Sequence, residues 1–459
     1  MKILIYGATE SGYMAARHLS TDHDVTILDE QDRLPERFAN LDVSFVSASG
    51  ANVLALEQTN AAQMDLFVAC SSVDEANIVA CWTIKRIADI ETVCFVHKFE
   101  LYQNLNYDDQ SRYKTTYDVD TVIWPEQLLT QDIFQIVSVP EAVDVEFFES
   151  GRVKLFEYRI KEDAEILNQR IMDCSFPRNV LIVGIIRDNK LFIPQGATTI
   201  ELNDKVVFMG TSPALDVLTA RFFNKDRSLK RAVVIGGGNV GFLLAQQFEE
   251  ARLQVTIIDL DRQRCNYLAE NLKHSLVLCG DGTDLELLEN ASVEDCNTTI
   301  CVTDNDEKNL LCSLLVKQLS SCRIIARVSN SNTALLFDRV GIDVVVSPLE
   351  AALKDLLNHI QSREIDILAL IEGGQGEVVR LTVPENFEET RVADLKFEAR
   401  AIIGVVQRGR QIIVPSGETL IKKRDQLNIF LIASTSAVTV KIFNWSRFLM
   451  SVSPLGTII

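Results

Sequence analysis

The sequence predicts an α/β protein with two parallel-sheet domains, each followed by a smaller α+β module. Two observations support this fold class. The segment Ile3–Gly12 (ILIYGATESG) has the same pattern as Ala232–Gly241 (AVVIGGGNVG). Both segments run from an apolar strand through a glycine-containing turn into a helix. A following strand ends in an acid in each half, at Asp29 and at Asp259. The chain therefore contains an internal duplication, and its function has to be read from how the two copies differ.

Apolar strands alternate with helices throughout the first copy. A helix is predicted over Glu75–Ala88. The predicted strands are Lys2–Tyr6, Val25–Asp29, Val43–Val46, Leu66–Cys70, Thr92–Val96 and Thr121–Ile123. This alternation indicates right-handed βαβ units and a Rossmann-like parallel sheet.

The second copy repeats this order. Pro348 falls where Pro125 fell, and the segment 73–77 (VDEAN) is mirrored by 305–309 (NDEKN). The predicted strands are Ala232–Ile235, Val255–Ile258, Ser275–Cys279, Thr299–Val302, Arg323–Val328 and Val344–Val346. We therefore expect a second Rossmann-like sheet with the same topology.

The stretches after each copy have short strands and tight turns, and they also repeat each other. The apolar strand Val180–Ile186 is followed by a tight turn and a second strand that ends at Pro194. The strand Ile402–Val406 is likewise followed by a tight turn and a second strand before Pro415. A hairpin with a further strand and a preceding helix predicts a small α+β module. The expected domains are residues 1–135, 139–222, 230–360 and 365–445.

Composition excludes several classes of protein. A net charge of −19 argues against a nucleic-acid partner and against binding to anionic lipid, although the acidic excess also serves solubility and permits docking to a basic protein surface. We see no signal peptide, and no apolar run approaches the roughly 20 residues of a bilayer helix. The ten cysteines are scattered, as expected for free thiols in a reducing compartment.

The glycine fingerprint is complete in the second copy. Gly236 permits the tight turn, Gly238 lets the backbone approach a pyrophosphate, and Gly241 lets the helix lie close to the sheet. Asn239 and Val240 begin that helix, whose N-terminus offers amide donors to phosphates. The pattern predicts a nucleotide site, and the alternative is a Rossmann-like scaffold that has lost its ligand.

The ribose acid is present in both copies, but the fingerprint is not. Asp259 can accept ribose hydroxyls and repel a 2′-phosphate, which favours NAD over NADP. The first copy keeps Gly7, Gly12 and Asp29, but Thr9 stands at the middle glycine position. A β-branched side chain there displaces the phosphate or forces another pose.

A polar lip follows the third strand of the second copy. Gly280–Asp284 (GDGTD), which includes Asp281, places glycines and acids at the carboxyl end of a strand, where nucleotides bind. The first copy reads Ala48–Asn52 (ASGAN) there and lacks both acids. A plain strand-to-helix turn is the alternative interpretation.

Further polar residues are expected at the same crevice. Thr303 and Asp304 follow the fourth strand. Arg327 ends the fifth strand and could neutralise a phosphate or pair with Asp304 or Asp306. Arg262 could stack on adenine, or be a solvated helix residue.

The chemistry of a dehydrogenase is not visible. Among the five histidines only His97 ends a strand on the nucleotide side, and it lies in the first copy. No Tyr is followed four residues later by Lys, and there is no nucleophile elbow, Walker loop or metal cluster. A nucleotide site without visible catalytic groups is typical of a sensor.

These motifs resemble the RCK/KTN regulators of potassium conductance in their tandem form. The resemblance rests on Gly236–Gly241, Asp259, Gly280–Asp284, Thr303–Leu310 and Gly341–Asp343 before Ser347-Pro348. The small modules resemble the RCK C-terminal subdomains. The resemblance implies an oligomeric ring docked beneath a membrane-embedded potassium pore subunit, with NAD(H), and ATP or ADP, in the crevices. It implies that Gly236, Gly238, Gly241, Asp259, Asp281 and Arg327 hold the nucleotide.

The leading hypothesis is a cytosolic, non-enzymatic subunit that senses a nucleotide and regulates potassium transport. An NAD-dependent oxidoreductase of unknown substrate is the second hypothesis, and a structural ring subunit without nucleotide is the third. We expect the second copy to hold NAD more firmly and the first chiefly to complete the ring.

Overall fold

The computed structural model describes residues 1–21, 23–106, 117–139, 142–222, 231–329, 331–360, 365–371, 375–395 and 400–432. The chain divides into two compact units, one formed by Met1–Leu129 with Ser347–His359 and the other by Thr130–Val346 with the residues from Ile360 on. The predicted four-part division stays a prediction, and residues 433–445 of its last part lie outside the described residues. In the part that is described, no helix has the length and apolar character needed to cross a membrane.

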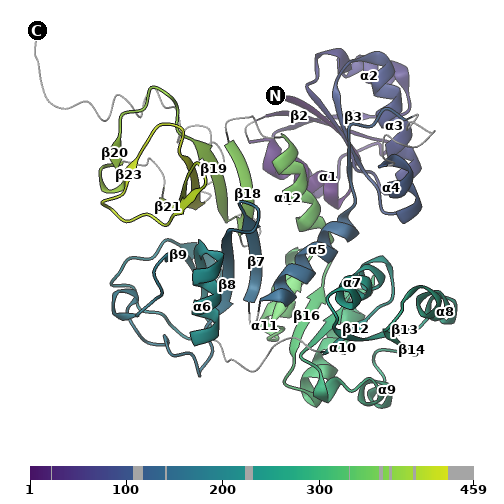
Figure 1. Cartoon of the computed structure of the whole chain (residues 1–459). Coiled ribbons are helices and arrows are strands. Elements are labelled where there is room, and N and C mark those ends of the chain that lie inside the picture. The colour runs from purple at the N-terminus through teal and green to yellow at the C-terminus, as the bar shows by residue number, and fades with distance from the viewer. Residues whose placement is uncertain are drawn as a thin grey trace, which may run out of the picture. The chain divides into compact units, whose positions relative to one another are not determined.

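The first unit contains a six-stranded parallel sheet of order β3-β2-β1-β4-β5-β6 (Figure 1). Its central strands are buried because helices pack on both faces. The strands are β1 (Lys2–Tyr6), β2 (Asp24–Asp29), β3 (Val43–Ser47), β4 (Leu66–Ala69), β5 (Glu91–Phe95) and β6 (Thr121–Ile123). The helices are α1 (Glu10–Leu19), α2 (Val53–Gln58), α3 (Asp74–Ile87) and α4 (Phe99–Leu105), with 3₁₀ turns η1 (Glu36–Phe38) and η2 (Ala61–Gln63).

The second unit contains the matching sheet, of order β14-β13-β12-β15-β16-β17. The same strand order in both sheets confirms the predicted Rossmann-like topology. The strands are β12 (Arg231–Ile235), β13 (Gln254–Asp259), β14 (Leu276–Cys279), β15 (Thr298–Cys301), β16 (Arg323–Arg327) and β17 (Val344–Val346). The helices are α7 (Asn239–Glu250), α8 (Arg262–Asn271), α9 (Leu285–Asn290), α10 (Asp306–Leu319) and α11 (Ser331–Arg339), with the turn η4 (Val293–Asp295).

The copies differ after the strand that ends in the acid. The second copy continues into α8, which Asp261 caps by accepting a hydrogen bond from the amide of Gln263 at 2.8 Å. The first copy forms only the 3₁₀ turn η1, which Pro35 precedes. A proline within this short segment interrupts a helix, so the first crevice lacks the helical wall that α8 provides in the second.

The last helix of each Rossmann-like copy packs with the other copy's unit. Helix α12 (Pro348–Ile360) follows β17 but belongs to the first unit, where His359 Nε2 lies 2.7 Å from Glu91 Oε1. Helix α5 (Pro125–Ser138) follows β6, and from Thr130 on it belongs to the second unit. There Phe134 stacks on Phe248 with ring centroids 5.9 Å apart. This exchange of terminal helices is a feature of the division of the chain into its two units.

Two five-stranded antiparallel sheets form the small modules of the second unit, with orders β10-β9-β11-β8-β7 and β18-β19-β24-β21-β22. They share a hydrophobic core in which Phe148, Val207 and Met209 of one module pack with Val405 and Phe430 of the other. The first has β7 (Ala142–Phe148), β8 (Val153–Arg159), β9 (Val180–Arg187), β10 (Lys190–Phe192), β11 (Lys205–Thr211), α6 (Ser212–Phe222) and η3 (Ile171–Asp173). The second has β18 (Ile365–Ile371), β19 (Gly376–Thr382), β21 (Ala401–Arg408), β22 (Gln411–Ile413), β24 (Gln426–Ile432), the pair β20 (Thr390–Arg391) and β23 (Leu420–Ile421), and η5 (Val392–Asp394).

Candidate functional site

The glycine turn of the second copy is open at the start of α7. Gly236 has φ +108°, and a Cβ on Gly241 would lie 1.9 Å from the carbonyl oxygen of Gly236, so both positions require glycine. Gly238 is exposed, and a Cβ built on it would meet nothing within 4 Å. No side chain caps α7. The turn therefore presents a free, positively polarised helix N-terminus to the crevice, which suits an anion.

The first copy has the same frame, but a side chain closes it. Gly7 has φ +117°, and a Cβ on Gly12 would again lie 1.9 Å from the preceding turn carbonyl. Thr9 caps α1: its hydroxyl accepts a hydrogen bond from the amide of Gly12 at 3.2 Å and donates to the carbonyl oxygen of Cys70 at 2.8 Å. The Thr9 hydroxyl thus occupies an amide donor that the second copy leaves uncapped, and the displacement of a phosphate by Thr9 stays a prediction.

Asp259 holds the glycine turn. Its Oδ2 accepts a hydrogen bond from the amide of Gly237 at 2.6 Å, and its Oδ1 accepts one from the amide of Asp261 at 2.8 Å. Asp29 does the same in the first copy, with the amides of Ala8 at 2.6 Å and Gln31 at 3.0 Å. A carboxylate oxygen has two lone pairs, so Asp259 still has acceptor capacity for a ribose hydroxyl.

The acids of the lip have local partners. Asp281 accepts hydrogen bonds from the amide of Thr283 at 3.0 Å and from its hydroxyl at 2.9 Å, and these bonds lower the pKa of the Asp281 carboxyl. Asp284 caps α9. In the first copy Asn52 caps α2 in the same way. The first copy keeps this cap but lacks both acids, so its lip carries less negative charge.

Asn309 joins the carboxyl ends of β15 and β16. This fully buried side chain accepts hydrogen bonds from the amide of Thr303 at 2.9 Å and from its hydroxyl at 2.6 Å, and it donates to the carbonyl oxygen of Arg327 at 3.0 Å. Asn77 makes the corresponding bonds to Ser71 and to the carbonyl oxygen of Phe95. The repeated asparagine within the mirrored segments 73–77 and 305–309 was the sequence signal for this role.

Arg327 is half-buried at the end of β16, and its side chain has no hydrogen bond or ion pair to another residue that the structure describes. The alternative pairing with Asp306 is wrong, because the carboxylate of Asp306 accepts hydrogen bonds from the amide and the hydroxyl of Ser329 instead. Asp304 is exposed next to Thr303.

The arginine at the glycine turn is Arg264. Its guanidinium donates to the carbonyl oxygens of Gly237 and Gly238 and lies over the ring of Tyr267, 4.8 Å from the centroid. Arg262 is exposed at the first position of α8. Sequence reasoning missed Arg264, which lies two positions further along the same helix.

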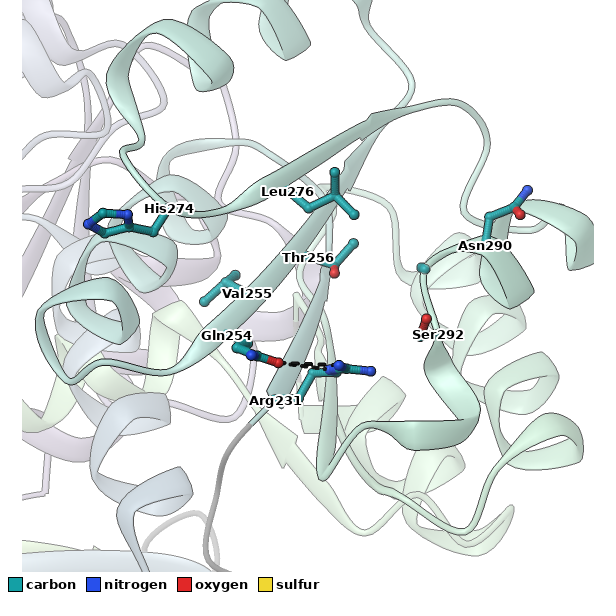
Figure 2. Close-up of a pocket in the computed structure, with 9 residues that line it drawn as sticks. Arg231, Gln254, Val255, Thr256, His274, Leu276, Asn290 and Ser292 are labelled. Atoms are coloured by element: carbon teal, nitrogen blue, oxygen red, sulfur yellow. Dashed lines mark hydrogen bonds between the residues drawn. The ribbon is translucent and has the colours of Figure 1, made fainter.

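His274, His359 and the hollow of Figure 2 lie at the amino ends of strands. The hollow, of ≈ 320 Å³, is lined by Arg231, Gln254 and Leu276, which begin β12, β13 and β14, and by His274. It is therefore at the amino ends of the strands, whereas the glycine turn is at their carboxyl ends. His359 pairs with Glu91 at the start of β5. Main-chain amides at the glycine turn and the carboxylate of Asp259 are the polar groups that the crevice offers, and Arg327 ends the neighbouring strand β16.

Comparisons with known proteins agree with the duplicated fold. A family model described as the TrkA-N domain matches residues 3–110 and again 232–348, and the TrkA-C domain model matches residues 155–222. The Trk system potassium uptake protein TrkA homolog 1 of Methanosarcina mazei is 35% identical over 457 residues, which cover 96% of this chain and 100% of that protein. The corresponding protein TrkA of Halomonas elongata is 27% identical over 452 residues, 94% of this chain and 96% of that protein.

A solved structure has the same fold. The GsuK channel bound to NAD covers 98% of this chain, and 79% of that chain is covered, with a TM-score of 0.59 and 17% identity. The GsuK RCK domain alone gives a TM-score of 0.59, with 98% of this chain and 95% of that chain covered at 17% identity. Together with the family models and the full-length relatives, this fold places the chain: it belongs to the TrkA family of Trk-system potassium-uptake proteins.

Proposed function

We propose that this chain is the nucleotide-sensing regulatory subunit of a potassium-uptake system and that it gates a membrane-embedded, TrkH-like pore subunit without being an enzyme. The observation that carries the proposal is the contrast between the open turn at Gly238 and the turn closed by Thr9. One crevice of each chain is then a receptor and the other is structural support. The family membership supplies the link to potassium transport.

The proposed ligand is NAD(H), with ATP or ADP as competing nucleotides. Phosphates would lie against the amides of Gly238, Asn239, Val240 and Gly241, beside Gly236. Asp259 would accept ribose hydroxyls. Arg327, Asp281, Thr303 and Asp304 would complete the crevice, with Arg262 at its rim. In the first copy Gly7, Gly12 and Asp29 keep the frame of a weaker site.

A homo-oligomeric ring is the proposed assembly, and a tetramer of tandem chains is its simplest form. Matched apolar side chains are exposed on corresponding helices of both copies: Val53, Val79 and Trp82 on α2 and α3, and Leu285, Leu311 and Leu314 on α9 and α10. Repeated exposed apolar residues at equivalent positions are typical of an interface made many times around a ring.

A regulator of this kind works through differential affinity. A nucleotide shifts the ring between two shapes only by binding one shape more tightly, typically by ~1–3 kcal/mol of coupling per site. The ring would be cytoplasmic and peripheral, at the inner face of the cell membrane. There it would bind cytoplasmic nucleotides, and the resulting change in ring shape would act on the pore subunit.

Equilibrium titration of the full chain with NAD, NADH, ATP and ADP tests the proposal. We expect binding without turnover, loss of affinity in Asp259→Ala, and little change in the matched first-copy variant Asp29→Ala. Consumption of NADH with a small substrate would favour the oxidoreductase. Potassium flux through vesicles that contain the pore subunit, with and without the chain and nucleotide, tests gating: flux that is indifferent to both contradicts it.

A further inference from the structure

Two cysteines lie beside the acid of the second crevice. Cys265 is buried in the first turns of α8, and its Sγ donates a hydrogen bond to the carbonyl oxygen of Asp259 at 3.3 Å. Cys279 is the exposed last residue of β14 and pairs in register with Asp259 of β13. Both cysteines therefore flank the residue that holds the glycine turn.

The two cysteines also lie on the same face of the sheet. Side chains of a strand alternate between the faces of the sheet, and Leu278 packs into the core that includes Leu288 and Cys312, under α9 and α10. Cys279 must then point to the opposite face, where α8 packs. The Sγ of Cys265 lies 4.0 Å from the carbonyl oxygen of Leu278, next to Cys279. Burial, and next the contact with the Cys279 thiol, raise the pKa of Cys265 to about 12.

We propose that Cys265 and Cys279 are a thiol-modification site that closes reversibly to a disulfide and weakens nucleotide binding at the second crevice. The inference deepens the proposed function, on which its binding consequence rests. The co-reactant is a low-molecular-weight disulfide. Cys279 is the entry point because it is exposed and Cys265 is not.

The exchange balances in two steps. The Cys279 thiolate attacks one sulfur of the small disulfide, forms a mixed disulfide and releases one small thiol. Cys265 then loses its proton and attacks the Cys279 sulfur, and the second small thiol leaves. The protein pair gives up two electrons and two protons, which the small disulfide gains as it becomes two thiols.

A disulfide between Cys265 and Cys279 would affect nucleotide binding by moving helix α8. A disulfide requires sulfurs ~2.05 Å apart, closer than any non-bonded contact, so the first turns of α8 move toward β14. The neighbouring Arg264 then shifts away from the carbonyl oxygens of Gly237 and Gly238, to which it now donates. The carbonyl oxygen of Asp259 also loses the Cys265 hydrogen bond. The turn and its acid leave the arrangement that presents amides to a phosphate.

A second cysteine pair in the same unit is a matched control. Cys296 and Cys322 both contact the hydroxyl of Thr299, each with a sulfur 3.3 Å from it. Both are buried in the core, which a small disulfide cannot enter. We expect this pair to stay reduced in the folded chain.

The test treats the full chain with hydroxyethyl disulfide, maps linked peptides by non-reducing mass spectrometry, and titrates NAD before oxidation, after it, and after reduction with dithiothreitol. We expect a 265–279 link without a 296–322 link, and NAD affinity reduced about fivefold or more and restored by reduction. Because coupling is reciprocal, bound NAD should disfavour the disulfide by the same factor. Cys279→Ser should bind NAD normally and be insensitive to the oxidant.

The experiment distinguishes failure of the disulfide from failure of its coupling to nucleotide binding and from failure of the proposed function. Absence of the 265–279 link overturns the modification site, and a link with unchanged NAD affinity overturns its coupling to the crevice. If the reduced chain binds no nucleotide, the proposed function and the coupling both fail, while the peptide map still decides whether the pair closes.

Discussion

The hydroxyl of Thr9 accepts the amide hydrogen of Gly12 at 3.2 Å, and Gly238 stands where Thr9 would be in the second copy. The two turns are otherwise alike, with Gly7 and Gly236 at φ +117° and +108°. One side chain therefore decides whether the helix N-terminus is satisfied internally or left to a ligand.

Gly238→Thr should close the second turn. The residue has φ −61°, and a Cβ there meets nothing within 4 Å, so the variant should fold with a stability within a few tenths of a kcal/mol of wild type. Its hydroxyl would take the Gly241 amide, and losing one hydrogen bond to a charged phosphate should weaken NAD binding about tenfold or more. Calorimetric titration measures this. Unchanged affinity would show that phosphates do not use this amide.

The reverse change, Thr9→Gly, should open the first turn. Removing the cap frees the Gly12 amide at a cost of a few tenths of a kcal/mol. We expect additional, weak nucleotide binding in the first copy, seen as a rise in the number of nucleotides bound per chain. Thr9→Ser keeps the hydroxyl and serves as the control, and equal stoichiometry in the two variants would contradict the capping argument.

Asn309→Ala should damage stability and binding together. The side chain is fully buried, and its loss leaves the amide of Thr303 and the carbonyl of Arg327 without their partner, a cost of about 2–3 kcal/mol in unfolding free energy. Asn77→Ala should cost the same in the first copy but leave NAD affinity unchanged. Denaturant unfolding and titration separate the two effects. Equal losses of NAD affinity in both variants would contradict the assignment of the nucleotide to the second copy.

The two parallel sheets were predictable from the sequence because they depend on local sequence patterns. Glycines at strand ends, alternating apolar runs and the repeated order of both were enough to predict two Rossmann-like sheets. The exchange of α5 and α12 was not predictable in this way. The contact between His359 and Glu91 joins residues far apart in the chain, and no local pattern marks it.

The sequence predicted which residue types occupy the candidate site, but not the directions and contacts of their side chains. Thr9 is visible in the sequence as a departure from glycine, but the direction of its hydroxyl depends on Cys70, which follows the neighbouring strand β4. The sequence marks Arg262 because it closely follows the acid, whereas the position of Arg264 on α8 brings its guanidinium to the turn. The sequence shows Asn309 as part of a repeated segment, but its role depends on which strand ends meet in the fold.

Glu249 should make the second unit sensitive to acid. Its carboxylate accepts hydrogen bonds from the amides of Lys273, His274 and Ser275 at 3.0, 2.7 and 2.7 Å, and from the Ser275 hydroxyl at 2.6 Å. Burial alone would raise the pKa of Glu249, but these bonds outweigh it and lower the pKa. A carboxyl with a depressed folded pKa stabilises the fold fully above its unfolded pKa of about 4.3, and this contribution is lost as the pH falls through the folded value.

Glu249→Gln should therefore be less stable than wild type at pH 7, and the difference should shrink below a pH of about 4.3 as the wild-type carboxyl becomes neutral too. The bonds it loses hold the segment that leads into β14, including His274 at the hollow of Figure 2. Glu250→Gln, at the exposed neighbouring position, is the matched control and should show no such pH dependence. Unfolding free energies measured across pH 3–7 decide the matter, because a constant deficit over that range would mean that Glu249 acts by its shape and not by its charge.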